Sequence, residues 1–588
     1  MKAKNDAQVV KNTPVLLIFS ALCALFGSGA IVGVTILSNP TLGWMLFSGL
    51  LSSYIVCFIV LFLLVLGCGS ILPELAYVSL PVAVLACGVR TTFASARFVN
   101  SLAIALVFLC LGAAATVCCL WAWHKYPTPQ KKPKKPLATL PAILAMLGMG
   151  AAAALSLGLF ALIFHGRLDS LQTDKTAAGI GQMLYYMQNS AQPFTTLLTG
   201  EPQSYFATQF SPLWYLLLPV YVLSKHSLLA VGIALYALML SAIIPLWRIC
   251  RKLSLSPLPS AALCIALATC PLLFGGGSAG GTLSMLSLPL FLWLADALMG
   301  KRPYLALIPL CLGLCIGFEV ALWLVFFCLY LAMSIPRQNR CAGVICAAIS
   351  AIGAIATGIW LALMQSPVLT DLFSGIGWQI GQKLLFLFLL LAPCALLPLL
   401  CKQKWALVLL IPYVLFHLVA DASTFSGVFC TFAYPAIAAV FLLSAHGTAN
   451  LQAMIKGVSL RTALPACALC ASLLLATPYV AVLHQLYAAP EEQQATDTDH
   501  MHDLLARLPQ NASVTASESL LCALHDRTWL YALEDDPTDP GTNVIVLDLR
   551  EDFIPSGMES YNVAYYQKLG YTLRDDLSQK GLLAVLYK

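Results

Sequence analysis

Long apolar runs, separated by short polar or basic turns, dominate this chain from about residue 13 to residue 486. A helix that crosses the hydrocarbon layer of a membrane needs roughly 20 mostly apolar residues. Runs of about this length recur at about 13–37, 43–67, 70–89, 101–123, 138–164, 226–247, 257–274, 282–299, 304–317, 320–333, 341–364, 384–401, 405–420, 427–446 and 464–486. The pattern predicts an all-α polytopic membrane protein with about fifteen transmembrane helices, although 304–333 also fits one long helix.

The last hundred residues follow a different pattern. From about residue 491 charged residues return, and short apolar segments of strand and helix length alternate. Helices are expected at Thr498–Leu508 and Tyr561–Leu569, and strands at Ser513–Ala516, Trp529–Leu533, Asn543–Leu549, Tyr571–Leu577 and Leu582–Tyr587. Residues 491–588 are therefore predicted to form a small α/β domain.

Composition supports the membrane class. Hydrophobic residues make up 60% of the chain and charged residues 10%, whereas soluble domains carry roughly 25% charged residues. Most of the 21 cysteines lie inside apolar runs, where a thiol behaves as a small hydrophobic group. No cysteine and histidine spacing predicts a zinc site, so no metal ligand is assigned.

Basic residues mark one side of the predicted membrane domain. They cluster at Lys2–Lys11, Lys125–Lys135, Arg248–Lys252, Lys301/Arg302, Arg337/Arg340, Lys402/Lys404 and Lys456/Arg461. Because basic loops stay in the cytoplasm, the N-terminus is expected inside, and the loop 165–225 and residues 491–588 outside. The tract within 124–137 then serves as a cytoplasmic linker, and the net charge of +6 does not indicate a nucleic-acid partner. Residues 1–123 add N-terminal helices to a transmembrane domain at 138–487.

The outer loop 165–225 contains two apolar segments. GQMLYYMQNSAQPF, within 181–194, has the Tyr and Met residues of an interfacial amphipathic helix. Leu213–Leu223 is too short to cross the membrane and is expected to dip into or lie along the outer face.

Carboxylates near or inside the apolar runs are the candidates for chemistry, because burying a charge in lipid is costly. Asp296 lies near the end of its run beside Lys301, which favours a snorkelling or ion-pair role over catalysis, whereas Glu319 in CIGFEVALW has no cationic neighbour in sequence. Glu319 is therefore either a functional group or a helix cap. Asp169 and Asp174 begin the outer loop. One interpretation is that they are solvated residues at the start of a loop. The other is that one of them acts as a general base, or binds a divalent cation that bridges a lipid phosphate.

A family resemblance covers about residues 160–588. The chain resembles the bacterial membrane family called domain of unknown function 2079 in four segments: IGQMLYYMQNSAQPFTTLLTGEPQSYFATQFSPLWYLLLPVYVLSKH, GLCIGFEVALWLVFFCLYL, FAYPAIAAVFLLSA and LPQNASVTASESLLCALHDRTWLYAL. This family is related to the GT-C glycosyltransferases, which take a sugar from a polyprenyl-phosphate donor and use an acidic residue of the first outer loop as the base.

The resemblance implies transfer of a sugar from a membrane lipid, a polyprenyl-phosphate sugar, to an acceptor outside the cytoplasm. It implies catalytic roles for Asp169, Asp174 and Glu319, and it leaves open whether a divalent cation takes part. Donor-binding roles are implied for Gln182, Gln209, Tyr215 and Tyr434. The chain also departs from the family, with Thr176, Gln209, Val320 and Ala433 where the pattern has polar or acidic residues.

Two hypotheses follow. A GT-C-like transferase predicts that Asp169 or Asp174 converges with Gln209 and Glu319 on one outer cavity that opens to lipid. A catalytically inactive membrane scaffold or transporter-like protein of the cell envelope predicts that no carboxylate lies in an outer cavity. The near absence of paired intramembrane charges and of internal repeats disfavours a transporter.

Overall fold

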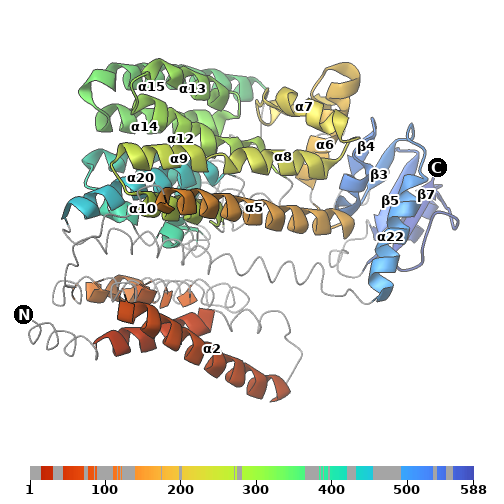
Figure 1. Ribbon diagram of the computed structural model, residues 1–588. Helices are drawn as coiled ribbons and strands as arrows, with labels where there is room; N and C mark the ends of the chain where they lie inside the picture. Colours follow the sequence, from red (N-terminus) through yellow and green to blue (C-terminus); the bar gives the residue numbers. More distant parts are fainter. Residues whose placement is uncertain are drawn as a thin grey trace, which may run out of the picture.

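The computed structural model of the protein has a bundle of apolar helices with a small sheet domain at one end (Figure 1). It describes residues 15–30, 44–71, 140–173, 175–197, 202–270, 281–364, 397–419, 432–454, 492–533, 540–550 and 561–588, with isolated positions between 77 and 121, at 272–273 and between 383 and 394. The predicted linker 124–137, Asp174 and the predicted helix at 464–486 lie outside the described residues.

The bundle is built from helices whose sequences are apolar on almost every face. Its described helices are Val15–Ala30, α2 (Trp44–Ile71), α5 (Leu140–Asp169), α7 (Trp214–Leu223), α8 (Leu228–Leu240), α9 (Ile243–Lys252), α10 (Pro257–Ala268), α12 (Ser287–Leu298), α13 (Leu307–Leu314), α14 (Phe318–Ser334), α15 (Arg340–Leu363), α18 (Leu410–Tyr413) and α20 (Tyr434–Met454). Short 3₁₀ or π segments join them: η2 (Leu283–Leu286), η3 (Pro303–Ala306), η4 (Arg337–Asn339), η5 (Ala392–Cys394), η6 (Leu397–Leu400), η7 (Lys404–Leu409) and η8 (Val414–Val419).

Within the described residues, three helical stretches are long and apolar enough to cross a membrane: Ala145–Asp169, Leu228–Lys252 and Arg337–Leu363. Other apolar helices have 10 to 17 residues. In both the long and the shorter helices many large apolar side chains are exposed, for example Ile352 and Leu216, which fits a surface that faces lipid rather than water. The membrane class is confirmed, whereas the number of about fifteen crossings stays a prediction.

The stretch 304–333 forms two helices. α13 ends at Leu314, and α14 begins at Phe318 after the extended residue Gly317. A side chain on Gly317 would meet the Glu319 carboxylate, with both oxygens 2.8 Å from the added carbon. The chain therefore breaks where a glycine lets the carboxylate fold back over the helix start.

Glycine also sets close packing elsewhere in the bundle. α14 and α15 pack along their length, and a carbon added to Gly343 would lie 2.8 Å from the backbone Cα of Ala332. In α20, a carbon added to Gly447 would collide with the carbonyl oxygen of Leu397 in η6. Small residues let helix backbones approach closely in membrane proteins.

The loop 165–225, which the sequence predicts on the outer side, holds α6 (Lys175–Ser190), a two-stranded ribbon of β1 (Phe194–Thr195) and β2 (Gln203–Ser204), and η1 (Tyr205–Ala207). α6 matches the expected amphipathic helix in position. Every residue from Ala177 to Leu184 is buried, on all sides of the helix, and α6 contacts the C-terminal domain. α7 has 10 residues, which gives a length of roughly 15 Å. It is too short to cross the membrane, as expected.

The C-terminal domain contains α22 (Glu492–Ala506), η9 (Glu518–Leu524), α23 (Val563–Lys568) and a five-stranded sheet. Its strands are β3 (Val514–Ala516), β4 (Leu530–Ala532), β5 (Val544–Asp548), β6 (Thr572–Leu573) and β7 (Leu583–Tyr587), in the order β4-β3-β5-β7-β6. β3 pairs in parallel with β4 and β5, and β7 pairs antiparallel with β5 and β6. All the expected elements of this domain are present, with shifted ends.

Side chains of the central strand alternate between two cores, as a strand requires. Val544 and Val546 belong to the same buried cluster as the helix bundle, whereas Ile545 and Leu547 pack with Tyr566 of α23. The bundle-side face of the sheet is therefore continuous with the membrane domain, and this joins the two parts into one body.

Candidate active site

A cavity of about 290 Å³ lies where the bundle meets the C-terminal domain. The end of α5 and the start of α8 form one wall, and α22 and η9 form the other. Its lining residues include His165, Asp169, His226, His502, Cys522 and His525. The cavity thus gathers one carboxylate and four imidazoles from segments up to 360 residues apart in the chain, from His165 to His525.

Asp169 is the carboxylate of this cavity. It occupies the last turn of α5, and its Oδ2 contacts Nδ1 of His165 one turn earlier, with side chains 62% and 51% exposed, respectively. On the other wall, Nε2 of His502 donates to the Asp169 carbonyl oxygen at 3.0 Å. An exposed carboxylate with an imidazole partner in a cavity can accept a proton from a bound hydroxyl group.

His525 forms a half-buried part of the wall. Its Nδ1 lies 2.7 Å from the Cys522 carbonyl oxygen, and its Nε2 lies 3.1 Å from that of His226. Burial lowers the pKa of His525 below its ordinary value, and the two carbonyl contacts oppose this shift. The imidazole also packs against Gly181, where an added carbon would lie 2.6 Å from the ring.

The C-terminal domain holds the loop that follows Asp169. Arg550 donates from Nη1 to the Ser170 carbonyl oxygen at 2.9 Å and from Nη2 to that of Leu171 at 3.2 Å. The buried Asp548 orients this guanidinium at 2.6 Å. Asp169 therefore sits between a rigid helix and a loop that the C-terminal domain fixes.

Gln182, expected to bind a donor, is fully buried under the same domain. Its oxygen accepts from Thr195 Oγ1 and the Thr196 amide, and its nitrogen lies within 3.3 Å of Thr196 Oγ1 and the carbonyl oxygens of Arg527 and Thr528. In this arrangement Gln182 joins α6, the β1–β2 ribbon and the C-terminal domain. Donor binding by Gln182 stays a prediction.

Glu319 and Gln209 meet at a second place. The Glu319 carboxylate is 4% exposed in the first turn of α14, and Gln209 Nε2 donates to its Oε1 at 3.0 Å. The N-terminal end of a helix favours a negative charge. This arrangement brings together two of the three expected residues, whereas Asp169 lines a cavity whose walls include neither Gln209 nor Glu319.

Two tyrosines complete the expected set. Tyr215 is 41% exposed, and its hydroxyl donates to the Ala191 carbonyl oxygen at 3.0 Å. Tyr434 begins α20 and is fully buried. Neither lines the cavity around Asp169.

Sequence reasoning missed the histidines. The four-residue spacing of His165 and Asp169 on a helix could have predicted their contact, because residues with this spacing lie on the same side of a helix. His502 and His525 carry no signal of this kind, because the fold alone brings them to α5. Within the described part of the chain, no three His, Cys, Asp or Glu side chains are placed to hold a metal ion.

Comparisons with known proteins found similar solved structures and one matching family model. Two solved structures are similar to it: ArnT from Cupriavidus metallidurans bound to undecaprenyl phosphate, with TM-score 0.49 and 12% identity over 74% of this chain and 97% of that one, and the apo state of the same protein, with TM-score 0.47 and 13% identity over 74% and 98%. No curated protein matches the chain. The model of the family described as "Predicted membrane protein (DUF2079)" matches residues 354–572, which confirms over that stretch the resemblance expected from the sequence.

Proposed function

We propose that this protein is a membrane glycosyltransferase of the GT-C type. It would transfer a sugar from a polyprenyl-phosphate donor to an acceptor on the side of the membrane that carries the C-terminal domain, outside the cytoplasm. The observation that carries the proposal is the exposed Asp169 carboxylate, paired with His165 and held in a cavity between the bundle and that domain. The cavity volume of about 290 Å³ is at the lower end for a small-molecule site and fits one sugar ring.

In the proposed reaction, Asp169 takes the proton from an acceptor hydroxyl group. The acceptor oxygen forms a bond to the anomeric carbon, and the bond between that carbon and the phosphate oxygen breaks. Its electron pair leaves with the polyprenyl phosphate. Imidazole N–H groups on the cavity wall are of the type that hydrogen-bond phosphate oxygens. Glu319, with Gln209, is a second acidic position whose catalytic role is proposed from the family resemblance.

A turnover assay tests the proposal. Purified full-length protein would be incubated with a panel of polyprenyl-phosphate monosaccharides and with membranes as the source of acceptor, and release of polyprenyl phosphate would be measured. Asp169→Asn should lower turnover by about 10²- to 10⁴-fold, as expected for loss of a general base. Asp499→Asn is the matched control, because Asp499 is exposed on α22 and does not line the cavity.

An inactive scaffold of the cell envelope is the second candidate. It is favoured by the pairing of Glu319 with Gln209, which satisfies the buried carboxylate within the chain itself. Turnover that is absent from wild type across the donor panel would favour this candidate over the enzyme. Turnover that is present and equal in wild type, Asp169→Asn and Glu319→Gln would instead refute the catalytic roles proposed for these two carboxylates.

A further inference from the structure

A second and larger cavity lies on the bundle between α9, α12, η3 and α13. Its volume is about 590 Å³. In Figure 1 the chain runs from α8, near the C-terminal domain, to α9, away from it. This cavity is therefore separate from the candidate active site, and it belongs to the end of the bundle where the basic turns gather.

The charge at one end of this cavity is strongly positive. Arg248, Lys252, Lys301 and Arg302 line it, and the only acidic lining residue is Asp296. Four positive charges and one negative charge leave a net charge of +3 among the lining residues.

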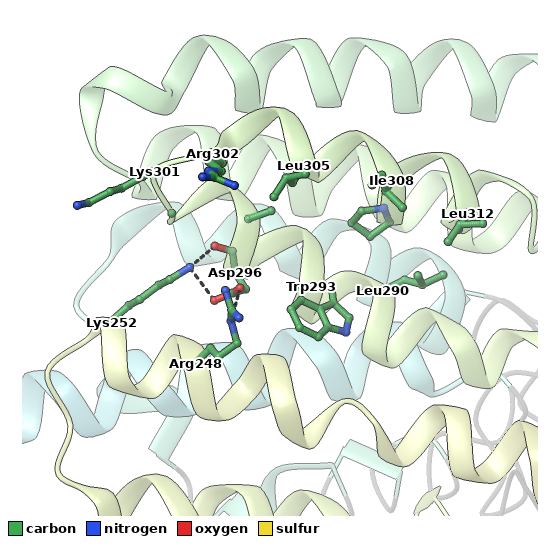
Figure 2. A pocket seen from close by; sticks show the side chains of 13 residues that line it. Arg248, Lys252, Leu290, Trp293, Asp296, Lys301, Arg302, Leu305, Ile308 and Leu312 are labelled. Atoms are coloured by element: carbon green, nitrogen blue, oxygen red, sulfur yellow. Dashed lines mark hydrogen bonds and ion pairs between the residues drawn. The ribbon is translucent and has the colours of Figure 1, made fainter.

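Asp296 forms ion pairs with two of the four cations. Its side chain is 3% exposed, Arg248 Nε donates to Oδ2 at 2.9 Å, and Lys252 Nζ lies 2.6 Å from Oδ1. Lys252 also donates to the Asp296 carbonyl oxygen. Both carboxylate oxygens are therefore in ion pairs at the charged end of the cavity, as the dashed lines in Figure 2 show.

Lys301 and Arg302 remain on the rim. Both are exposed, and among the residues that the structure describes neither forms an ion pair. The Arg248 guanidinium lies over the Trp293 ring, 5.4 Å from its centre, and its side chain is 55% exposed. The rim therefore offers positive charge that the chain itself does not neutralise.

The rest of the cavity is apolar. Leu305, Ile308 and Leu312 follow helical spacing on one wall, and Leu290 and Trp293 face them from α12. Figure 2 shows these two rows leading away from the charged end. Ile308 is 61% exposed, and the row from Leu305 to Leu312 rises roughly 10 Å. An apolar groove of this length on a membrane protein faces acyl chains.

We propose that this cavity binds an anionic phospholipid. The phosphate would lie between Lys301, Arg302 and Arg248, and one acyl chain would follow the groove between α12 and α13. Basic pockets between membrane helices on the cytoplasmic side suit anionic headgroups, and guanidinium groups match phosphate oxygens in geometry. A free phosphate ion would use the charged rim but would leave the apolar groove unexplained.

The test measures lipid binding to purified full-length protein in detergent by native mass spectrometry, with phosphatidylglycerol and phosphatidylcholine as probes. Phosphatidylglycerol should bind more tightly. The double variant Lys301→Gln/Arg302→Gln should bind it roughly tenfold to 30-fold more weakly. Neither substitution removes a partner of Asp296, so the buried ion pairs stay intact.

The matched control is Arg337→Gln/Arg340→Gln. It removes the same charge from exposed residues that do not line the cavity, at a segment that contacts the end of α12 through Asn339. Its phosphatidylglycerol affinity should change by less than about threefold, because screening limits the reach of exposed charges. Equal losses in the two double variants would overturn the proposal, as would equal affinity for the two lipids in wild type.

Two further measurements locate the lipid. Phosphatidylglycerol with brominated acyl chains should quench the fluorescence of Trp293, so wild type should lose more emission than Trp293→Phe. Equal quenching would overturn the placement of the acyl chain in the groove. Displacement of the lipid by an equal concentration of glycerol 3-phosphate would show a site for free phosphate instead and would also overturn the proposal.

Discussion

Replacing Gln182 by alanine tests whether its side chain fixes the C-terminal domain to the bundle. The change removes the acceptor of the Thr196 amide and the donor to the carbonyl oxygens of the buried Arg527 and the exposed Thr528. Each buried group left without a partner costs about 1–3 kcal/mol. The Thr528 carbonyl oxygen keeps its hydrogen bond from Tyr186, so the Thr196 amide and the Arg527 carbonyl oxygen are the groups left unpaired. The cost is about 3 kcal/mol, which lowers the docking equilibrium about 100-fold.

Hydrogen–deuterium exchange measures this effect directly. In Gln182→Ala, amides of the β1–β2 ribbon and of β4 should exchange about 100-fold faster, whereas amides of α14 and α15 should keep their protection. Tyr186→Phe is the control, because it loses one hydrogen bond to the Thr528 carbonyl oxygen, 2.7 Å long, at a half-buried position. It should change the same amides by about tenfold at most. Wild-type protection in Gln182→Ala would refute the reasoning.

Three further predictions concern stability and pH. Asp296→Asn leaves two cations without their carboxylate and should lower the free energy of unfolding of the bundle by about 2 kcal/mol, measured by thermal unfolding in detergent. The loss is smaller than for a fully buried pair because both cations are partly exposed. Because burial holds the pKa of His525 below its ordinary value, the undocked domain binds a proton more readily, and docking should weaken as pH falls below about 6.5. Limited proteolysis at pH 7.5 and 5.5 should show this, and His525→Asn should remove the pH dependence. Gly447→Ala places a carbon against the Leu397 carbonyl oxygen and should cost about 1–3 kcal/mol, whereas Gly158→Ala, with open space around it, should leave the thermal midpoint unchanged or slightly higher.

The helices and strands of the C-terminal domain could be predicted from the sequence because they depend on local residue patterns. Alternating β-branched and apolar residues in 543–549 predict a strand, and β5 occupies Val544–Asp548. The helix before Pro509 was also expected, although α22 begins at Glu492, six residues earlier than Thr498. Helix starts are less certain because polar first turns carry no apolar periodicity.

Contacts between side chains that are far apart in the sequence could not be predicted in the same way. The sequence favoured a snorkelling or ion-pair role for Asp296 beside Lys301. The structure has the ion pair, but the partners are Arg248 and Lys252 from α9 rather than Lys301. Glu319 likewise finds Gln209, 110 positions away. Apolar helices have little facial asymmetry in lipid, so the sequence does not show which helices become neighbours.

The contact of Gln182 with Arg527 joins positions 345 residues apart. A ribosome adds roughly 5–20 residues per second, so the amide emerges about 20–70 s before its partners. During that interval the later helices insert, and α6 lacks its contacts with the C-terminal domain. The loop beside Asp169 is therefore among the last parts of this protein to assemble. A nascent chain that stops short of residue 527 would lack the contact between this loop and the C-terminal domain.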